Sequence, residues 1–329
     1  MGLSSMQPAV RVTLEEPPCR VLAPPHHRCG ACGGSCESVL VTVPDAELPI
    51  LRQQASSLGV ERPVVEGHLR LDGARCAFLD PEDRCGIHAR FGLEAKPAVC
   101  QQYPLVVLET EAGRRAGIDP GCFHAHGDRG AWPVLDPSGV PARSVHFDSE
   151  QAHSEGALLA ALGAPGATLG SVLGLLAGGR GHGSDLPPGL GARWICCLRD
   201  AGLQRFLNPA IAGRALRSAL GPAFDLVPEL DPDVPPAWLG SEPAADQLVR
   251  EAVQRLVYLR VCSSQLDLVQ GVALLGLLGG VLLAWCDPRP AALGPGMAGW
   301  CRLLRGPHFW RALAPDLQQL MWLAGAGRG

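Results

Sequence analysis

Seven cysteines between residues 29 and 122 constrain this chain more than any other feature. The first three form the motif Cys29-x-x-Cys32-x-x-x-Cys36, and single thiols follow at Cys76, Cys85, Cys100 and Cys122. A set of thiols this dense is typical either of a metal or iron–sulfur site or of a disulfide framework. Unrelated buried thiols are the third possibility.

The cellular compartment of the protein bears on whether the thiols bind metal or form disulfides. Disulfides persist where conditions are oxidising, whereas the same spacing in a reducing compartment more often binds metal. The N-terminal stretch MGLSSMQPAVRV lacks a charged start followed by an apolar core, and Met6 does not fit a myristoylation site. The total of 13 cysteines is odd, which also fits poorly with complete pairing. We therefore expect a cytoplasmic protein whose thiols bind a metal or a cluster.

The identity of the metal is left open by the spacing. Structural zinc usually takes two Cys or His pairs, but only Cys29 and Cys32 form such a pair here. Iron–sulfur clusters also take four thiolates, and these can come from scattered loops. Seven thiols exceed one four-ligand site, so two metals share them, some are structural, or histidines complete a second site. The nearby histidines are His26, His27, His88, His124 and His126, and the best candidates are His88 and His124.

The motifs around the thiols resemble a known family over about residues 26–125. The motifs are Cys29-x-x-Cys32-Gly33-x-x-Cys36, Cys76-x-x-Leu79, Cys85-x-Ile87-His88, Lys96-Pro97-x-x-Cys100-x-x-Tyr103-Pro104 and Gly121-Cys122. This ordered set is similar to the CxxCxxCC family of zinc- or iron-chelating domains, which is related to the flagellin lysine N-methylase. The chain departs from the family pattern at Ser35, His88, Lys96 and Tyr103. The change at Ser35 removes an expected thiolate and can reduce two metals to one.

The resemblance implies a metal- or iron–sulfur-binding protein, with a 4Fe-4S cluster as the expected cofactor and zinc as the alternative. The expected metal ligands are Cys29, Cys32, Cys36, Cys76, Cys85, Cys100 and Cys122. A second function that the resemblance implies is S-adenosylmethionine-dependent methylation of a lysine in a protein substrate. A third is a structural zinc-binding interaction protein. The motif order C-x2-C-x3-C is the reverse of the radical S-adenosylmethionine motif, and no sequence signature identifies catalytic residues.

Composition narrows the partners. The net charge of −4 argues against a nucleic-acid partner, since nucleic-acid-binding domains are usually basic. Two tyrosines and seven phenylalanines offer few rings for base stacking. The segment Leu268–Trp285 is long and apolar, but acidic residues bracket it and no Lys or Arg flanks it. We therefore expect a buried helix there and no membrane span.

The pattern of elements changes near residue 148, which predicts an α+β fold in two regions. Residues 1–148 form a small cysteine-rich region of loops and hairpins, and residues 149–329 form a mostly α-helical region. In the first region we expect a helix from Asp45, as its cap, to about Leu58, and a short helix from Pro97. Hairpins are expected around Asp72-Gly73 and between residues 105–109 and 115–119.

In the second region, apolar periodicity and Pro- and Gly-rich separators predict six helices. Their approximate ranges are 150–162, 166–178, 193–219, 243–262, 266–285 and 307–324. In the fourth of these, Arg250, Tyr258 and Arg260 are expected to form a snorkelling or salt-bridged surface, with a pocket lining as the alternative. The remaining cysteines of this region are expected to be buried thiols without a metal, and they are Cys196, Cys197, Cys262, Cys286 and Cys301.

Overall fold

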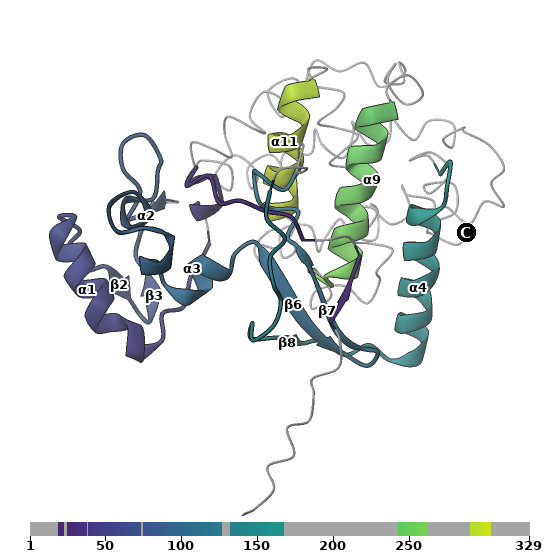
Figure 1. Cartoon of the computed structure of the whole chain (residues 1–329), viewed down its shortest axis with the longest axis horizontal. Helices are drawn as coiled ribbons and strands as arrows, with labels where there is room; N and C mark the ends of the chain where they lie inside the picture. Colours follow the sequence, from purple (N-terminus) through teal and green to yellow (C-terminus); the bar gives the residue numbers. More distant parts are fainter. Residues whose placement is uncertain are drawn as a thin grey trace, which may run out of the picture.

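The computed structural model describes residues 19–22, 25–37, 39–73, 75–126, 132–167, 243–261 and 290–303. Strands and helices both occur in these ranges, which confirms the predicted α+β class. The elements form two groups that lie beside each other in Figure 1. One group carries six of the nine cysteines that the structure describes, and the other is a four-stranded sheet with three helices on one face.

We call residues 25–104 the cysteine lobe. It is built from short elements: η1 (Gly34–Cys36), η2 (Asp45–Glu47), α1 (Leu48–Ser57), β2 (Val64–Val65), β3 (His68–Leu69), β4 (Leu71–Asp72), β5 (Arg75–Cys76), α2 (Gly86–Phe91), η3 (Leu93–Ala95) and α3 (Ala98–Gln102). Its core is small and centres on Leu51, Phe78 and Ile87, with Cys85 buried among them. Because this core buries little apolar area, it contributes limited stability to the lobe. A metal bound by the thiols would therefore add much to the stability of the lobe.

The start of α1 differs from the prediction. The helix lies within the predicted range and has a proline in its first turn, as expected for Pro49. The predicted Asp45 cap is wrong, since neither η2 nor α1 has a side-chain cap hydrogen bond. Asp45 lies inside the 3-10 turn, and Pro44 occupies the cap position before it. The Glu47 carboxylate instead accepts from the backbone N–H of Ala98 at 3.3 Å, which joins α1 to the start of α3.

Two hairpins confirm the predicted turns. β4 pairs with β5 in antiparallel register around Gly73, whose φ of 65° suits a residue without a side chain. β6 (Leu105–Thr110) pairs with β7 (Gly113–Ile118) over its full length. The edge strands β1 (Arg20–Val21) and β8 (Arg143–Ser144) each pair in parallel, which gives the order β1-β7-β6-β8.

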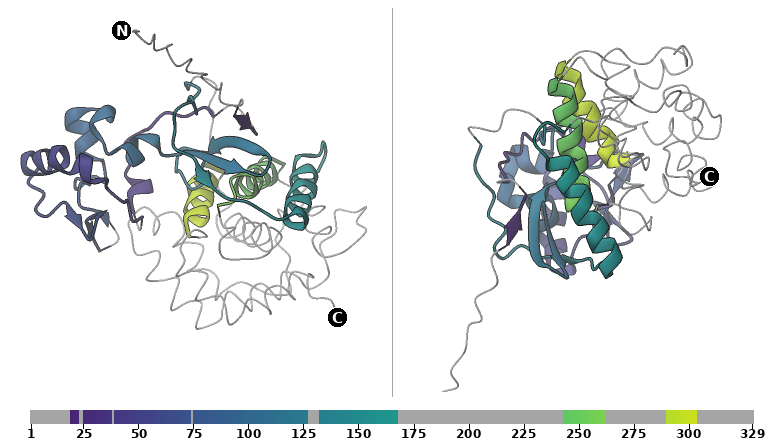
Figure 2. Two further views of the ribbon diagram at one scale, coloured as in Figure 1. Left: turned by 90° about the horizontal axis from the view of Figure 1, so that it is seen from below. Right: turned by 90° about the vertical axis from the view of Figure 1, so that its right-hand side faces the viewer.

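Three helices lie side by side over this sheet (Figure 2). They are α4 (Ser149–Gly163), α9 (Pro243–Tyr258) and α11 (Pro290–Leu303). The first two confirm predicted helices, and the Asp148 side chain caps α4 in a capping box with Gln151. The third was not predicted. The other predicted helices lie outside the described residues, except that residues 166 and 167 of the predicted helix 166–178 are described and are not helical. The segment Leu268–Trp285 and the thiols of Cys196, Cys197, Cys262 and Cys286 also lie outside them.

Within the ranges that the structure describes, no helix has the length and apolar character needed to cross a membrane.

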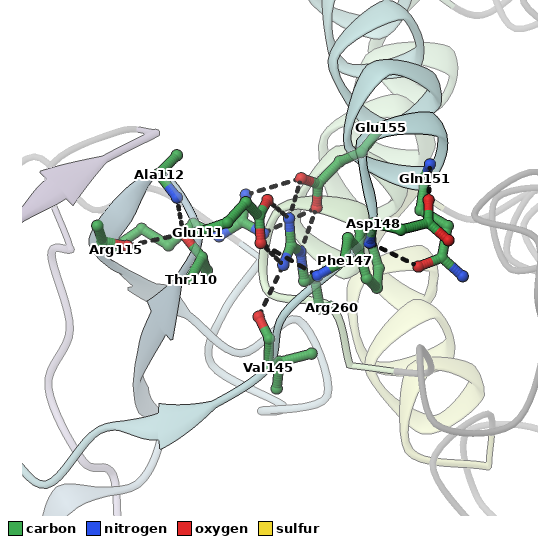
Figure 3. Close-up of polar contacts among 11 residues, drawn as sticks. Thr110, Glu111, Ala112, Arg115, Val145, Phe147, Asp148, Gln151, Glu155 and Arg260 are labelled. Carbon is green, nitrogen blue, oxygen red and sulfur yellow. Dashed lines mark hydrogen bonds and ion pairs between the residues drawn. The ribbon is translucent and has the colours of Figure 1, made fainter.

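A buried ionic network attaches the helices to the sheet (Figure 3). The Arg260 guanidinium, 1% exposed, donates to Glu155 at 2.7 Å and to Glu111 at 2.5 Å. Arg115 donates to the same Glu155 carboxylate at 2.8 Å. Burial alone would lower the pKa of Arg260, but the hydrogen bonds from its guanidinium to Glu155 and Glu111 outweigh this and raise it. The predicted salt bridges of Arg260 are therefore confirmed, but its predicted surface position is wrong, because the side chain is buried between the helices and the sheet.

This network predicts an acid-sensitive contribution to stability. Hydrogen bonds from Arg260 lower the pKa of Glu111 to about 2, against about 4.3 in an unfolded chain. Because the folded pKa is the lower one, Glu111 stabilises the fold above about pH 4.3, and this contribution is lost as the pH falls toward 2. We expect Glu111→Gln to reduce the loss of unfolding free energy between pH 5 and pH 3 in urea titrations.

The control for this measurement is Glu82→Gln, because Glu82 is exposed and pairs only with an exposed arginine among the contacts described. Any metal lost in acid affects both variants and the parent protein, so the difference between them isolates the Glu111 carboxylate. An equal pH dependence in Glu111→Gln and the parent protein would contradict the prediction.

Candidate metal centre

Residues 29–36, which we call the thiol loop, turn tightly and carry three of the seven thiols. Ala31 and Gly33 both adopt positive φ, at 52° and 64°. A side chain at Gly33 would overlap the carbonyl oxygen of Asp83, so only glycine fits this approach. The loop then enters η1, which ends at Cys36. This backbone conformation keeps the three thiols of the loop close together. Two other segments, one from the cysteine lobe and one that follows β7, lie on either side of the loop.

One of these segments brings thiols from the cysteine lobe. The antiparallel bridge between Glu37 and Arg75 places Cys36 opposite Cys76. The chain then turns back between Leu79 and Cys85, which form an antiparallel bridge. The Cys85 N–H donates to the Ala31 carbonyl at 3.4 Å, which holds this turn against the thiol loop.

Cys100 reaches the same place from the short helix α3, whose predicted start at Pro97 is confirmed. Cys85 belongs to the buried core of the cysteine lobe, and Cys76 and Cys100 pack against that core. Four thiols from three separate parts of the sequence therefore gather on this side of the thiol loop.

The second segment follows β7 and reaches the opposite part of the thiol loop. Cys122 is buried with Leu105 and Ile118 in the core of the sheet, apart from the core of the cysteine lobe. A Cβ at Gly30 would lie 2.7 Å from Nε2 of His124. The Phe123 ring covers the loop near Gly34, and Cys122, Phe123 and His124 thus form a wall against the thiol loop.

Cys29 is related to both sides. Its Sγ lies 3.9 Å from Nδ1 of His88, which is on α2 in the cysteine lobe. In its thiolate form, Cys29 is also close enough to Cys122 of the second segment to raise the pKa of that thiol.

The electrostatics of the thiols separate Cys32 from the others. Burial raises the pKa of Cys36 and Cys76 and raises that of Cys100 to about 12. Burial likewise raises the pKa of Cys122 to about 11. Burial alone would also raise the pKa of Cys32, but its contact with the His124 side chain outweighs this and lowers it. The buried thiols are therefore protonated near neutral pH, so a metal that binds them must displace their protons.

A half-buried lysine supplies positive charge beside these thiols. Lys96 is the only lysine in the chain. Burial alone would lower its pKa, but the negative charge of nearby cysteines in their thiolate form, led by Cys29 and Cys85, outweighs this and raises it. An ammonium group here offsets part of the negative charge that four thiolates and a metal or cluster would create.

The donor set was tested against the expected metal. In the part of the chain that the structure describes, no three His, Cys, Asp or Glu side chains are already placed to hold a metal ion. The described cysteines form no disulfide. Their soft thiol donors fit zinc or an iron–sulfur cluster, and Nε2 of His124 is buried without a hydrogen-bond partner. The residues thus fit such a group chemically, and binding requires the thiol side chains to turn toward one another.

The other candidate histidines make structural contacts. Nδ1 of His26 lies 2.9 Å from the carbonyl oxygen of Trp132. The His27 ring meets the Trp132 ring edge-on, and Nε2 of His126 lies 2.7 Å from the carbonyl oxygen of Pro120. Cys301 is buried on α11, as predicted for a thiol outside the cluster.

One residue of this region was missed by the sequence reasoning. Arg302, at the end of α11, is buried and donates to the carbonyl oxygen of Gly34 in the thiol loop. Burial lowers its pKa. No signal in the sequence links positions 34 and 302, because only the packing of α11 brings them together.

Comparison with known proteins supports the chemistry of this site. Residues 28–122 match the model of the CxxCxxCC family, which is described as a "Putative zinc- or iron-chelating domain". The matched range contains all seven thiols of the predicted site. The chain matches no curated protein and no solved structure.

Proposed function

We propose that the zinc- or iron-chelating domain matched at residues 28–122 holds an iron–sulfur cluster, and that cluster binding is the molecular activity of this chain. The proposed ligands come from the seven thiols: Cys29, Cys32, Cys36, Cys76, Cys85, Cys100 and Cys122. When bound, the cluster would supply either a redox centre or a covalent brace for the cysteine lobe.

The observation that carries the proposal is the convergence of thiols from separate turns. Cys36 lies opposite Cys76, and Cys76, Cys85 and Cys100 share one small core. Four thiolates from scattered loops are the usual ligands of an iron–sulfur cluster. Burial around the thiols would shield such a cluster from solvent, and the Lys96 ammonium would balance its charge.

Methyl transfer remains the second function that the family resemblance implied. In the described part of the chain, no observation favours it over metal binding, so S-adenosylmethionine and a protein substrate have no further support here. The structural zinc alternative uses the same thiols and is separated from the iron–sulfur proposal by metal analysis.

We expect the protein to be brown when it is purified without oxygen and to contain iron and acid-labile sulfide in equal amounts. Thiolate coordination of iron also gives visible charge-transfer absorption, which zinc does not. The measurement is iron, zinc and sulfide content per chain, together with the absorption spectrum before and after exposure to air. A colourless protein that carries zinc and no sulfide would overturn the iron–sulfur proposal and support structural zinc.

A further inference from the structure

We propose that the thiols serve two centres, and that His124 completes the second one as a zinc ligand. The inference rests on the proposed function for the first centre. The first centre would use Cys36, Cys76, Cys85 and Cys100, and the second would use Cys29, Cys32, Cys122 and Nε2 of His124. Three thiolates with one histidine are a known ligand set of structural zinc.

The backbone separates the two sets of thiols. Cys85 is in the core of the cysteine lobe, with Cys76 and Cys100 packed against it. Cys122 is instead in the core of the sheet, beneath β6 and β7. The thiol loop lies between these cores, with Cys36 opposite Cys76 at one end. The other end, around Gly30, faces His124. The two cores therefore present two separate groups of thiols to the thiol loop.

His124 has the features of a ligand for the second set. Its Nε2 is buried without a hydrogen-bond partner, which costs free energy that a metal bond would offset. Nε2 of His124 lies against Gly30, which is between Cys29 and Cys32 in the sequence. The imidazole ring also contacts the Cys32 side chain. His124 also follows Cys122 after one residue, so both enter the site from the same turn.

The surroundings hold the imidazole in place. The Trp132 ring meets the His124 ring edge-on, with 6.4 Å between the ring centroids. Glycine at position 30 leaves room for the ring, because a Cβ there would lie only 2.7 Å from Nε2. A ring that is positioned before binding loses less entropy when it becomes a ligand.

Two neighbours compete for the role of fourth ligand. His88 lies near Cys29, but it belongs to α2, on the side of the first set. Ser35 lies beside Cys122, and its buried hydroxyl also lacks a hydrogen-bond partner. A serine hydroxyl is a poor zinc ligand compared with imidazole. His124 is therefore the neutral donor best suited to three thiolates here.

The test measures zinc and iron in the anaerobically purified protein after dialysis against a weak chelator. We expect about one zinc beside about four iron per chain. His124→Gln should lose the zinc and keep the iron, whereas the matched variant His88→Gln should keep both. His124→Cys should retain zinc, because a thiolate replaces the imidazole. Replacement of zinc by Co²⁺ should then show stronger sulfur-to-cobalt charge transfer in His124→Cys than in the parent protein.

These results separate the inference from the proposed function. Protein without iron but with zinc that depends on His124 would contradict the proposed function and support the second centre. Iron-containing protein without zinc would overturn the inference and leave the proposed function standing. Zinc that is lost in His88→Gln but kept in His124→Gln would also overturn the inference. If His124→Gln does not fold, zinc retention and the Co²⁺ spectrum of His124→Cys decide the question.

Discussion

Simultaneous replacement of Cys85 and Cys100 by serine is expected to reduce bound iron and sulfide to background. Both thiols belong to the core of the cysteine lobe, and serine cannot replace thiolate as a cluster ligand. Binding of a structural metal can contribute on the order of 10 kcal/mol to folding. The small core of the cysteine lobe offers little to offset such a loss. We therefore expect residues 25–104 to become the first protease-sensitive region of this variant.

The matched control is Cys19→Ser, since Cys19 is partly buried and lies outside the predicted ligand set. It should keep the iron, the sulfide and the protease pattern of the parent protein. Limited proteolysis with mass spectrometry locates the first cuts, and metal analysis gives the loading. Normal iron content in the Cys85 and Cys100 double variant would contradict the ligand assignment, whatever its protease pattern.

Replacement of Arg260 by methionine is expected to lower the free energy of unfolding by about 3 kcal/mol. Methionine keeps much of the side-chain volume but leaves the Glu155 carboxylate, 7% exposed, with one guanidinium in place of two. It also removes the guanidinium that lies 3.7 Å from the centroid of the Phe147 ring. Because Arg260 connects α9 to both α4 and the β6–β7 turn, the loss should appear in global unfolding by urea.

Arg70→Met is the control for this change. Arg70 pairs with the exposed carboxylate of Asp72, and exposed ion pairs of this kind contribute at most about 1 kcal/mol. Adding Glu155→Gln to Arg260→Met should lower the stability further, since it leaves the buried Arg115 guanidinium without its carboxylate partner. A loss no larger in Arg260→Met than in Arg70→Met would show that the network contributes little to the fold.

The elements that the sequence predicted are those with strong local signals. Asp148 and Gln151 form a capping box at the start of α4, and the β6–β7 hairpin follows two clear apolar runs. α11 was missed because Pro295 and several glycines reduce its helical propensity. Packing overrides that propensity, since Gly294 lets the helix approach His126 closely. The ionic network around Arg260 depends on such long-range packing and could not be read from the sequence.

The candidate site shows the same division. The spacing of the cysteines and the family resemblance predicted the seven thiols as ligands, because both are local properties of the sequence. Which turns face each other depends on pairings such as Glu37 with Arg75, which have no local signal. The approach of His124 to Gly30 and of Arg302 to Gly34 likewise joins distant segments. The predicted boundary at residue 148 stays a prediction.

Lys96 gives this chain an unusual chemical property. As the only lysine in 329 residues, it carries the only side-chain amine of the protein. Reagents selective for amines therefore find only one side-chain amine in the chain, the one beside the thiols. A fluorophore or an isotope-labelled methyl group attached there would sit next to the proposed cluster without any engineered mutation. The same property means that enzymes that attach ubiquitin-like modifiers or acetyl groups to lysine side chains have a single target, which is half-buried in the fold.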